Sequence, residues 1–250
     1  MKKRLDKSQI ERFSRQLILK NIGAKGQKKI LSSKILIVGV GGLGCPAAEN
    51  LVRAGIGTIG LIDDDIVNLS NIHRQSLFNS KDIKKPKVNV AAKKLKEINP
   101  RTKIKTYKSR LDKNNIQNII KNYELIIDGS DNFKTKFLIN DYCIKYKKKL
   151  ITGAISKFDG HIFTFDFKDK KTASLKNFYQ EKEVSDDVLN CEFEGVLGTT
   201  ASIVGTTQAN EALKMIMEIG QNLKNQILII DLLNLNFRKV KFKKRSDKIR

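Results

Sequence analysis

The chain has 250 residues, of which 40% are hydrophobic, and this is enough for one α/β domain with a sizeable core. No apolar run is long enough to span a bilayer and the N-terminus lacks the apolar core of a signal peptide, so we expect a cytoplasmic protein without membrane contact. The formal net charge is +23, but the lysines are spread along the chain with few aromatic residues between them, which favours solvated surfaces over a nucleic-acid interface.

The first 155 residues predict alternating strands and helices. Ser8 followed by Glu11 has the pattern of a capping box and predicts a helix over 8–21, with a second short helix over 24–32. The expected elements after these are a strand over 34–40, a helix over 43–55, a strand over 58–63, a polar loop over 64–80, a helix from Pro86 to Ile98, a strand over 103–108, a helix around 112–121, a strand over 124–132 that runs into a polar turn, a helix over 133–146 and a strand over 149–155. This alternation predicts a parallel sheet with helices on both faces.

The alternation ends after residue 155. A strand over 160–167 is followed by a polar, irregular segment over 168–190, a helix within 195–219 and a pair of strands within 227–242. We therefore expect an α/β fold with a Rossmann-like, mostly parallel sheet that antiparallel strands extend at the C-terminal end. We expect a single domain, with N-terminal helices over 1–33, a nucleotide-binding half over 34–158 and a crossover loop with the sheet extension over 159–250.

A glycine-rich loop connects the first strand to its helix. Gly39, Gly41 and Gly44 form a GxGxxG pattern with Gly42 inside it, and such a loop lets the backbone approach a phosphate at a helix N-terminus. Asp63 follows 19 residues after Gly44, at the end of the next strand, where a carboxylate binds ribose hydroxyls. The pattern predicts a nucleotide site and leaves both NAD and ATP open.

Several other polar residues have structural explanations as well as functional ones. Arg74 and Lys87 taken singly are typical of solvated charges, and Asp131 could cap the helix that follows it with help from Asn132. We expect His73 to be a loop residue and not a catalyst, and His161 to be structural. We expect Cys45 and Cys143 to pack within helices, while for Cys191 packing and chemistry are both open.

Six motifs in order along nearly the whole chain resemble the ubiquitin-activating-enzyme superfamily, and more closely its bacterial MoeB/ThiF/HesA branch. They are RFSRQ (12–16), GVGGLG (39–44), LIDDDIVNLSNIHRQ (61–75), KPK (85–87), DGSDN (128–132) and CEFEGVLG (191–198). The resemblance implies ATP-dependent adenylation of the C-terminal Gly-Gly carboxylate of a ubiquitin-fold sulfur carrier, for molybdopterin or thiamin synthesis, with ATP and Mg²⁺ as cofactors.

The resemblance also implies roles for individual residues. The nucleotide would meet Gly42, the ribose Asp63, the phosphates Asn71, Arg74 and Lys87, and the magnesium Asp131, with Ser70, Gln75 and Asn132 beside them. Arg15 matches an arginine that reaches into the partner subunit's site, which implies a homodimer. Cys191 matches a cysteine that takes part in later thioester or persulfide chemistry in some members.

The chain departs from this family's pattern in two places. Many relatives bind zinc through two CxxC pairs, but residues 169–180 and the basic tail contain no cysteine, so we expect no zinc site and a different means of ordering the 168–190 segment. There is no C-terminal rhodanese-type extension, so we expect the sulfur donor to be a separate protein.

The chemistry agrees with the resemblance. A carboxylate is already ionised at neutral pH and needs no general base to attack a phosphate, and the chain has only two histidines. What the reaction needs is charge neutralisation and positioning, which arginine, lysine and Mg²⁺ supply. The alternatives are a superfamily member that adenylates a peptide or a tRNA base, an NAD(P)-dependent oxidoreductase, and a non-catalytic nucleotide-binding scaffold.

Overall fold

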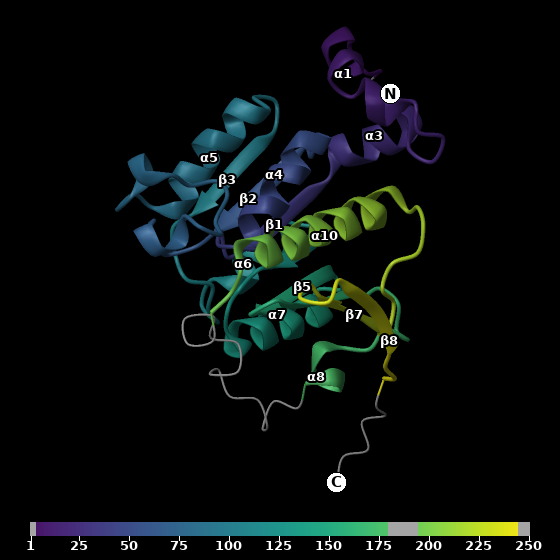
Figure 1. The fold of residues 1–250 in the computed structure, drawn as a ribbon. Coiled ribbons are helices and arrows are strands. Elements are labelled where there is room, and N and C mark those ends of the chain that lie inside the picture. Colours follow the sequence, from purple (N-terminus) through teal and green to yellow (C-terminus); the bar gives the residue numbers. More distant parts are fainter. Residues whose placement is uncertain (1–3, 180–194, 245–250) are drawn as a thin grey trace.

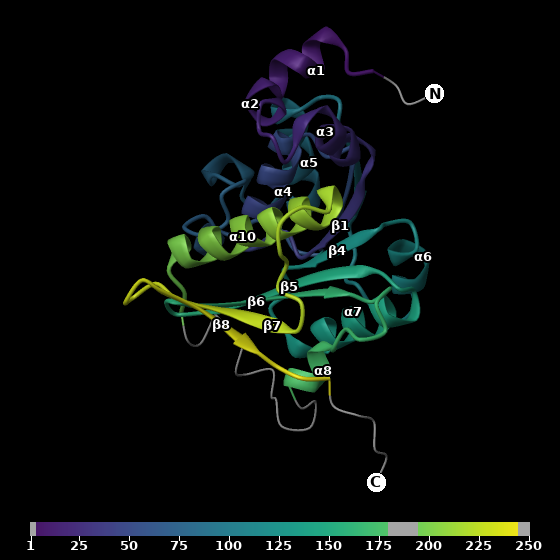
Figure 2. The same cartoon turned by 90° about the vertical axis from the view of Figure 1, so that its right-hand side faces the viewer.

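The computed structural model describes residues 4–179 and 195–244 (Figures 1 and 2). Eight strands form one sheet in the order β3-β2-β1-β4-β5-β6-β7-β8. The strands are β1 (Lys34–Val38), β2 (Thr58–Ile62), β3 (Lys103–Tyr107), β4 (Leu125–Asp128), β5 (Lys149–Ser156), β6 (Asp159–Asp166), β7 (Gln226–Asp231) and β8 (Asn236–Lys241). The first five pair in parallel and the last three antiparallel, which confirms the expected fold class.

Helices cover both faces of this sheet (Figure 1). They are α1 (Lys7–Arg12), α2 (Ser14–Leu17), α3 (Gly23–Ser32), α4 (Gly44–Ala54), α5 (Lys87–Ile98), α6 (Ile116–Ile120), α7 (Phe133–Lys145), α8 (Leu175–Phe178) and α10 (Gly198–Met217), with 3₁₀ turns η1 (Leu69–Asn71) and η2 (Ser80–Asp82). Alternate side chains of β1 enter two different cores, because successive strand residues point to opposite faces. Ile35 and Ile37 pack with α4, α5 and α10, whereas Leu36 and Val38 pack with α6 and α7.

The prediction of one N-terminal helix over 8–21 is wrong in two respects. Its cap is Asp6 rather than Ser8: the Asp6 carboxylate accepts from the Gln9 N–H, and the Gln9 side chain accepts from the Asp6 N–H. The helix also breaks at Phe13, which is 2% exposed and lies against Gly55, so burial of this ring divides the segment into α1 and α2.

The polar segment after β6 is ordered over its described part, up to residue 179. The Thr172 hydroxyl donates to the Asp166 carbonyl, the Ala173 N–H donates to Asn225 Oδ1, and the Leu175 N–H donates to Asn140 Oδ1. Leu175 is buried and begins the short helix α8, which packs on α7. Polar contacts to neighbouring elements thus hold this stretch, for which the sequence alone predicted no regular element.

The remaining elements follow the predictions with shifted ends. Helix α6 is about half as long as expected, because Asp112 and Asn115 bind backbone groups in a turn that occupies residues 112–115. Within the described residues, no helix combines the length and the hydropathy needed to cross a membrane.

Candidate nucleotide-binding site

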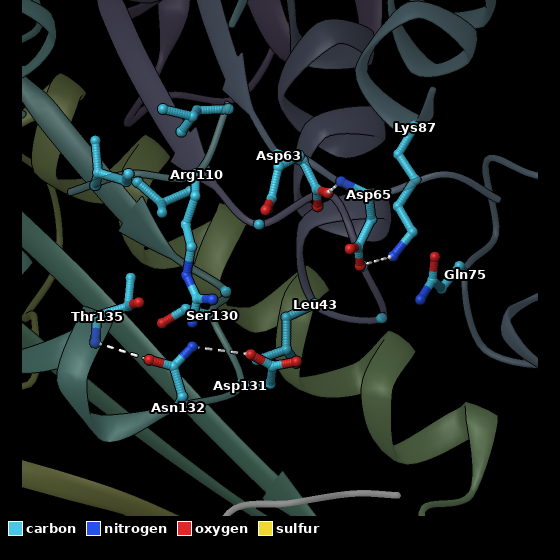
Figure 3. Close-up of a pocket in the computed structure, with 18 of the residues that line it drawn as sticks. Leu43, Asp63, Asp65, Gln75, Lys87, Arg110, Ser130, Asp131, Asn132 and Thr135 are labelled. Carbon is cyan, nitrogen blue, oxygen red and sulfur yellow. Dashed lines mark hydrogen bonds and ion pairs between the residues drawn. The ribbon is translucent and has the colours of Figure 1, made fainter. Parts of the chain in front are cut away.

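A cavity of about 320 Å³ opens where strands β1, β2, β3 and β4 end (Figure 3). Its lining comes from the loops that follow these strands, because the carboxyl ends of parallel strands meet at one edge of the sheet. Ten of the predicted site residues line it: Gly39, Gly41, Gly42, Asp63, Asn71, Arg74, Gln75, Lys87, Asp131 and Asn132. Residues almost 100 positions apart in the sequence therefore surround one space of the size that binds small ligands.

The glycine loop runs from β1 into α4. Gly39 has φ +83°, and a Cβ there would lie 2.8 Å from the Gly129 carbonyl oxygen, so only glycine allows the loop to pass this close to the turn after β4. Among the described residues, no side chain caps the N-terminus of α4. The N–H groups of its first turn and its positive dipole end therefore suit an anion, as expected for a phosphate loop.

Gly44 and Ser70 are predicted site residues that do not line the cavity. A Cβ on Gly44 would lie 1.9 Å from the Gly39 carbonyl oxygen, so Gly44 allows α4 to pack against the glycine loop. Ser70 is exposed, and its carbonyl accepts from Arg74 Nη1 at 2.9 Å, so its backbone orients the arginine.

Asp63 lies at the end of β2 beside the glycine loop. Its Oδ2 accepts from the Val40 N–H at 2.7 Å and its Oδ1 accepts from the Asp65 N–H at 2.8 Å. Burial raises the pKa of this carboxyl above the usual range, although the nearby Lys87 ammonium and the two N–H donors oppose the shift. Each oxygen keeps a lone pair for a further donor, so the carboxylate can also accept from a ribose.

The turn after β4 presents Asp131 to the cavity. Asn132, rather than Asp131, caps α7, because its Oδ1 accepts from the Thr135 N–H at 2.9 Å. The Asn132 amide donates to Asp131 Oδ1 at 3.1 Å, which orients a carboxylate that is otherwise exposed (Figure 3). Capping therefore does not explain Asp131. Carboxylate oxygens are preferred Mg²⁺ ligands, so Asp131 is suited to bind magnesium.

A buried network of polar side chains supports the turn after β4. The Lys136 ammonium donates to Asp128 Oδ2 at 3.2 Å and to the Gly153 carbonyl at 2.7 Å, and both side chains of the pair are at most 2% exposed. The Ser130 N–H and hydroxyl donate to Asp128 Oδ1, and Gln208 Nε2 on α10 donates to the Asp128 carbonyl. Asp128, at the end of β4 just before Asp131, thus connects β4, β5, α7 and α10.

The other predicted residues lie apart from the cavity. Arg15 is exposed on α2 and does not line it. Cys191 falls outside the described residues. Cys45 and Cys143 are fully buried, and burial raises the pKa of the Cys45 thiol to about 12, so both pack as expected and neither is a nucleophile at neutral pH.

The site thus combines a glycine loop, an aspartate placed for a ribose, two cationic side chains and a carboxylate that a neighbouring amide orients. The sequence profile described as the ThiF family matches residues 13–250. The chain belongs to the ThiF family.

Curated relatives agree with this membership. The ThiF-family chain is 38% identical over 237 residues to a probable molybdopterin-synthase adenylyltransferase of Gracilaria tenuistipitata, and covers 66% of that protein's length. It is 36% identical over 240 residues to the sulfur carrier protein adenylyltransferase of Thermus thermophilus, and covers 89% of it. Each alignment includes 95% of this chain, but the chain spans about half of relatives such as the Drosophila virilis adenylyltransferase and sulfurtransferase MOCS3, of which it covers 53%.

Solved structures share the fold. E. coli MccB, in a crystal structure with ATP, superposes with a TM-score of 0.83 at 21% identity, covering 94% of this chain and 72% of that one. At this level of identity, the likeness concerns the fold alone.

Sequence reasoning missed several residues of the cavity. Arg110 follows β3 and its side chain extends toward Ser130 and Asn132, where it has no hydrogen bond or ion pair to another described residue (Figure 3). Lys136 lies one turn into α7, and Asp65 two residues after Asp63. Arg110 could have been found, because β3 was predicted and its carboxyl end had to lie at the same edge as that of β2.

Proposed function

We propose that the chain is an ATP-dependent adenylyltransferase that activates the C-terminal Gly-Gly carboxylate of a ubiquitin-like sulfur carrier as an acyl-AMP, with release of pyrophosphate. The observation that carries the proposal is the convergence of Asp63, Arg74, Lys87 and Asp131 with the glycine loop around one cavity. A ribose-type carboxylate next to cationic side chains and the N-terminus of α4 suits a nucleoside triphosphate.

The reaction forms one bond and breaks one bond. A carboxylate oxygen of the carrier attacks the α-phosphorus of ATP, and the bond from that phosphorus to the α–β bridging oxygen breaks, so that pyrophosphate leaves with the electron pair. No proton is transferred, because the carboxylate is already ionised. This fits a cavity whose described lining contains no histidine, cysteine or tyrosine.

Arg74, Lys87 and the N–H groups of the glycine loop stabilise charge on the phosphates and hold the triphosphate for in-line attack. The exposed carboxylate of Asp131, oriented by Asn132, fits the oxygen-ligand preference of Mg²⁺ and would bind it. When bound, the metal supplies charge neutralisation on the phosphate oxygens.

The proposed acceptor follows from the relatives. Those of Gracilaria and Thermus are named for molybdopterin synthase and a sulfur carrier protein, which favours a carrier of the molybdopterin type over the thiamin type. We place the whole chain in one adenylation domain that acts as a cytoplasmic homodimer, with Arg15 reaching the partner's site and a separate protein donating sulfur. The exposed position of Arg15 on α2 supports this arrangement, since the side chain is available to another subunit.

The oxidoreductase alternative finds less support. Hydride transfer between a nicotinamide and an alcohol or carbonyl carbon requires a group that accepts or donates a proton at the attached oxygen. The described cavity lining offers carboxylates, amides and cations, but none of the imidazole or phenol groups that usually serve this role.

The decisive experiment is ATP–pyrophosphate exchange with Mg²⁺, adding Gly-Gly-ended carriers of the molybdopterin and thiamin types one at a time. Exchange that appears with only one carrier would establish carboxylate adenylation and identify the acceptor. Tight ATP binding without exchange for any carrier would contradict the proposed acceptor class but still support the assignment of the nucleotide site.

A further inference from the structure

Two aspartates after β2 link the glycine loop to Lys87. Asp63 accepts from the Val40 N–H with one carboxylate oxygen and from the Asp65 N–H with the other. The position of Asp65 is therefore fixed relative to the loop that approaches the phosphates. Asp65 in turn contacts Lys87, the first residue of α5 (Figure 3).

Asp65 contacts Lys87 at both ends of the lysine. The Lys87 N–H donates to the Asp65 carbonyl at 3.0 Å, and the Lys87 ammonium donates to Asp65 Oδ2 at 2.8 Å. The Lys87 side chain is only 6% exposed, whereas that of Asp65 is 65% exposed. A lysine side chain otherwise has many rotamers available, so this double contact selects one before any nucleotide arrives.

We propose that Asp65 is a positioning residue that aims the Lys87 ammonium at the triphosphate. The inference rests on the proposed function, because it takes the ligand of Lys87 to be the phosphates of ATP. Asp65 acts through Lys87 rather than on the nucleotide, since a carboxylate repels phosphate. Preorganised donors cost no reorganisation when the ligand binds, and this is the gain that Asp65 provides.

A stabilising role in folding is distinguished from positioning by its readout. A role in folding alone would weaken ATP and AMP alike, because it acts through the folded fraction of the chain and not through the phosphates. A purely electrostatic role gives the opposite sign, because removing a negative charge beside a bound triphosphate strengthens ATP binding. Positioning and repulsion are therefore distinguished by the direction in which ATP affinity changes.

Asp64 provides a matched control. It lies between Asp63 and Asp65, carries the same charge, and is exposed without a hydrogen bond or ion pair to another described residue. Its carboxylate oxygen lies within 4.8 Å of those of its two neighbours. Asp64→Asn thus removes the same charge at nearly the same place without removing the contact to Lys87.

The test is isothermal titration of the full chain with ATP and with AMP in the presence of Mg²⁺. We expect Asp65→Asn to weaken ATP about tenfold and AMP less than about twofold, since displacing a positioned group by about an ångström is costly. Asp64→Asn should not weaken ATP. In a Lys87→Ala background, Asp65→Asn should add no further loss, because the lysine through which it acts is gone.

Unchanged or stronger ATP binding by Asp65→Asn overturns the assignment, as does an equal loss for ATP and AMP. An additive loss in the Lys87→Ala background overturns it too. These outcomes differ from a failure of the proposed function, which would appear in the wild-type chain as no preference for ATP over AMP and no pyrophosphate exchange. Melting temperatures of the variants, each expected to stay above the temperature of the titration, separate positioning from unfolding.

Discussion

The two halves of the sheet place similar residue types in very different surroundings. Strands β1 and β4 of the parallel half are buried along nearly their whole length, whereas every residue of β8 in the antiparallel half is exposed. All described residues that line the cavity come from positions up to Ile155, which lies near the end of β5. The difference shows that Asp63 and Asp131, which follow the buried strands β2 and β4, stand on strands held from both faces, which limits their movement.

The largest expected effect comes from removing charged groups of the site. Arg74→Ala and Asp131→Ala should each lower the rate of the proposed carrier adenylation by at least about 100-fold, as losses of transition-state charge stabilisation do. Arg238→Ala on β8 removes an exposed arginine of the antiparallel half and should retain the wild-type rate. Pyrophosphate exchange measures the rates, and circular dichroism checks the fold. Wild-type rates for Arg74→Ala or Asp131→Ala would refute the site.

The second prediction concerns stability. Lys136→Met leaves the Asp128 carboxylate buried without its cation and should lower the free energy of unfolding by about 3–5 kcal/mol. Phe237→Ala on β8, where the residue is 53% exposed, should change the free energy of unfolding by less than about 0.5 kcal/mol. Urea unfolding measures both variants. Equal losses would show that the two halves do not differ in this way.

The third prediction concerns pH. Since burial raises the Asp63 pKa above its ordinary value of 3.8, its carboxylate takes up a proton at a higher pH than a free aspartate. Affinity for adenosine, which lacks phosphates, should therefore fall as the pH decreases through that raised value and recover above it. Asp63→Asn should bind adenosine more weakly at neutral pH and lose this titration. A wild-type profile that stays flat down to the ordinary aspartate value of 3.8 would contradict the ribose role.

The smallest expected effect is in the hairpin between β7 and β8. Leu235 has φ +55° and is 74% exposed, so Leu235→Gly should stabilise the chain by about 0.5–1 kcal/mol by relieving a left-handed backbone without losing burial. Leu233→Gly, at a position without positive φ in the same hairpin, serves as the control and should destabilise. Thermal melts compare the two, and a lower melting temperature for Leu235→Gly would be the contrary result.

The parallel half was predictable because its signals are local. Each buried strand is a short β-branched run, and the glycine loop and Asp63 stand at fixed distances from strand ends. The N-terminal helix was mispredicted because the burial of Phe13 against Gly55 depends on tertiary packing, which no local pattern encodes. Capping by Asn132, the network around Asp128 and the Asp65–Lys87 contact depend on side chains that only the folded chain brings together.

Helix α10 has a consequence for any attempt to shorten the protein. It lies across the sheet and contacts α4, β5 and β6 (Figure 2). A Cβ on Gly42 would come within 3.1 Å of Ala201, Gly153 lies against Gln208, and the same glutamine binds the Asp128 carbonyl. A fragment that ends after β5 would therefore contain every described residue that lines the cavity and yet lose the helix that holds three of the cavity's supports. The smallest piece of sequence that carries the site is not the smallest piece that can keep it assembled.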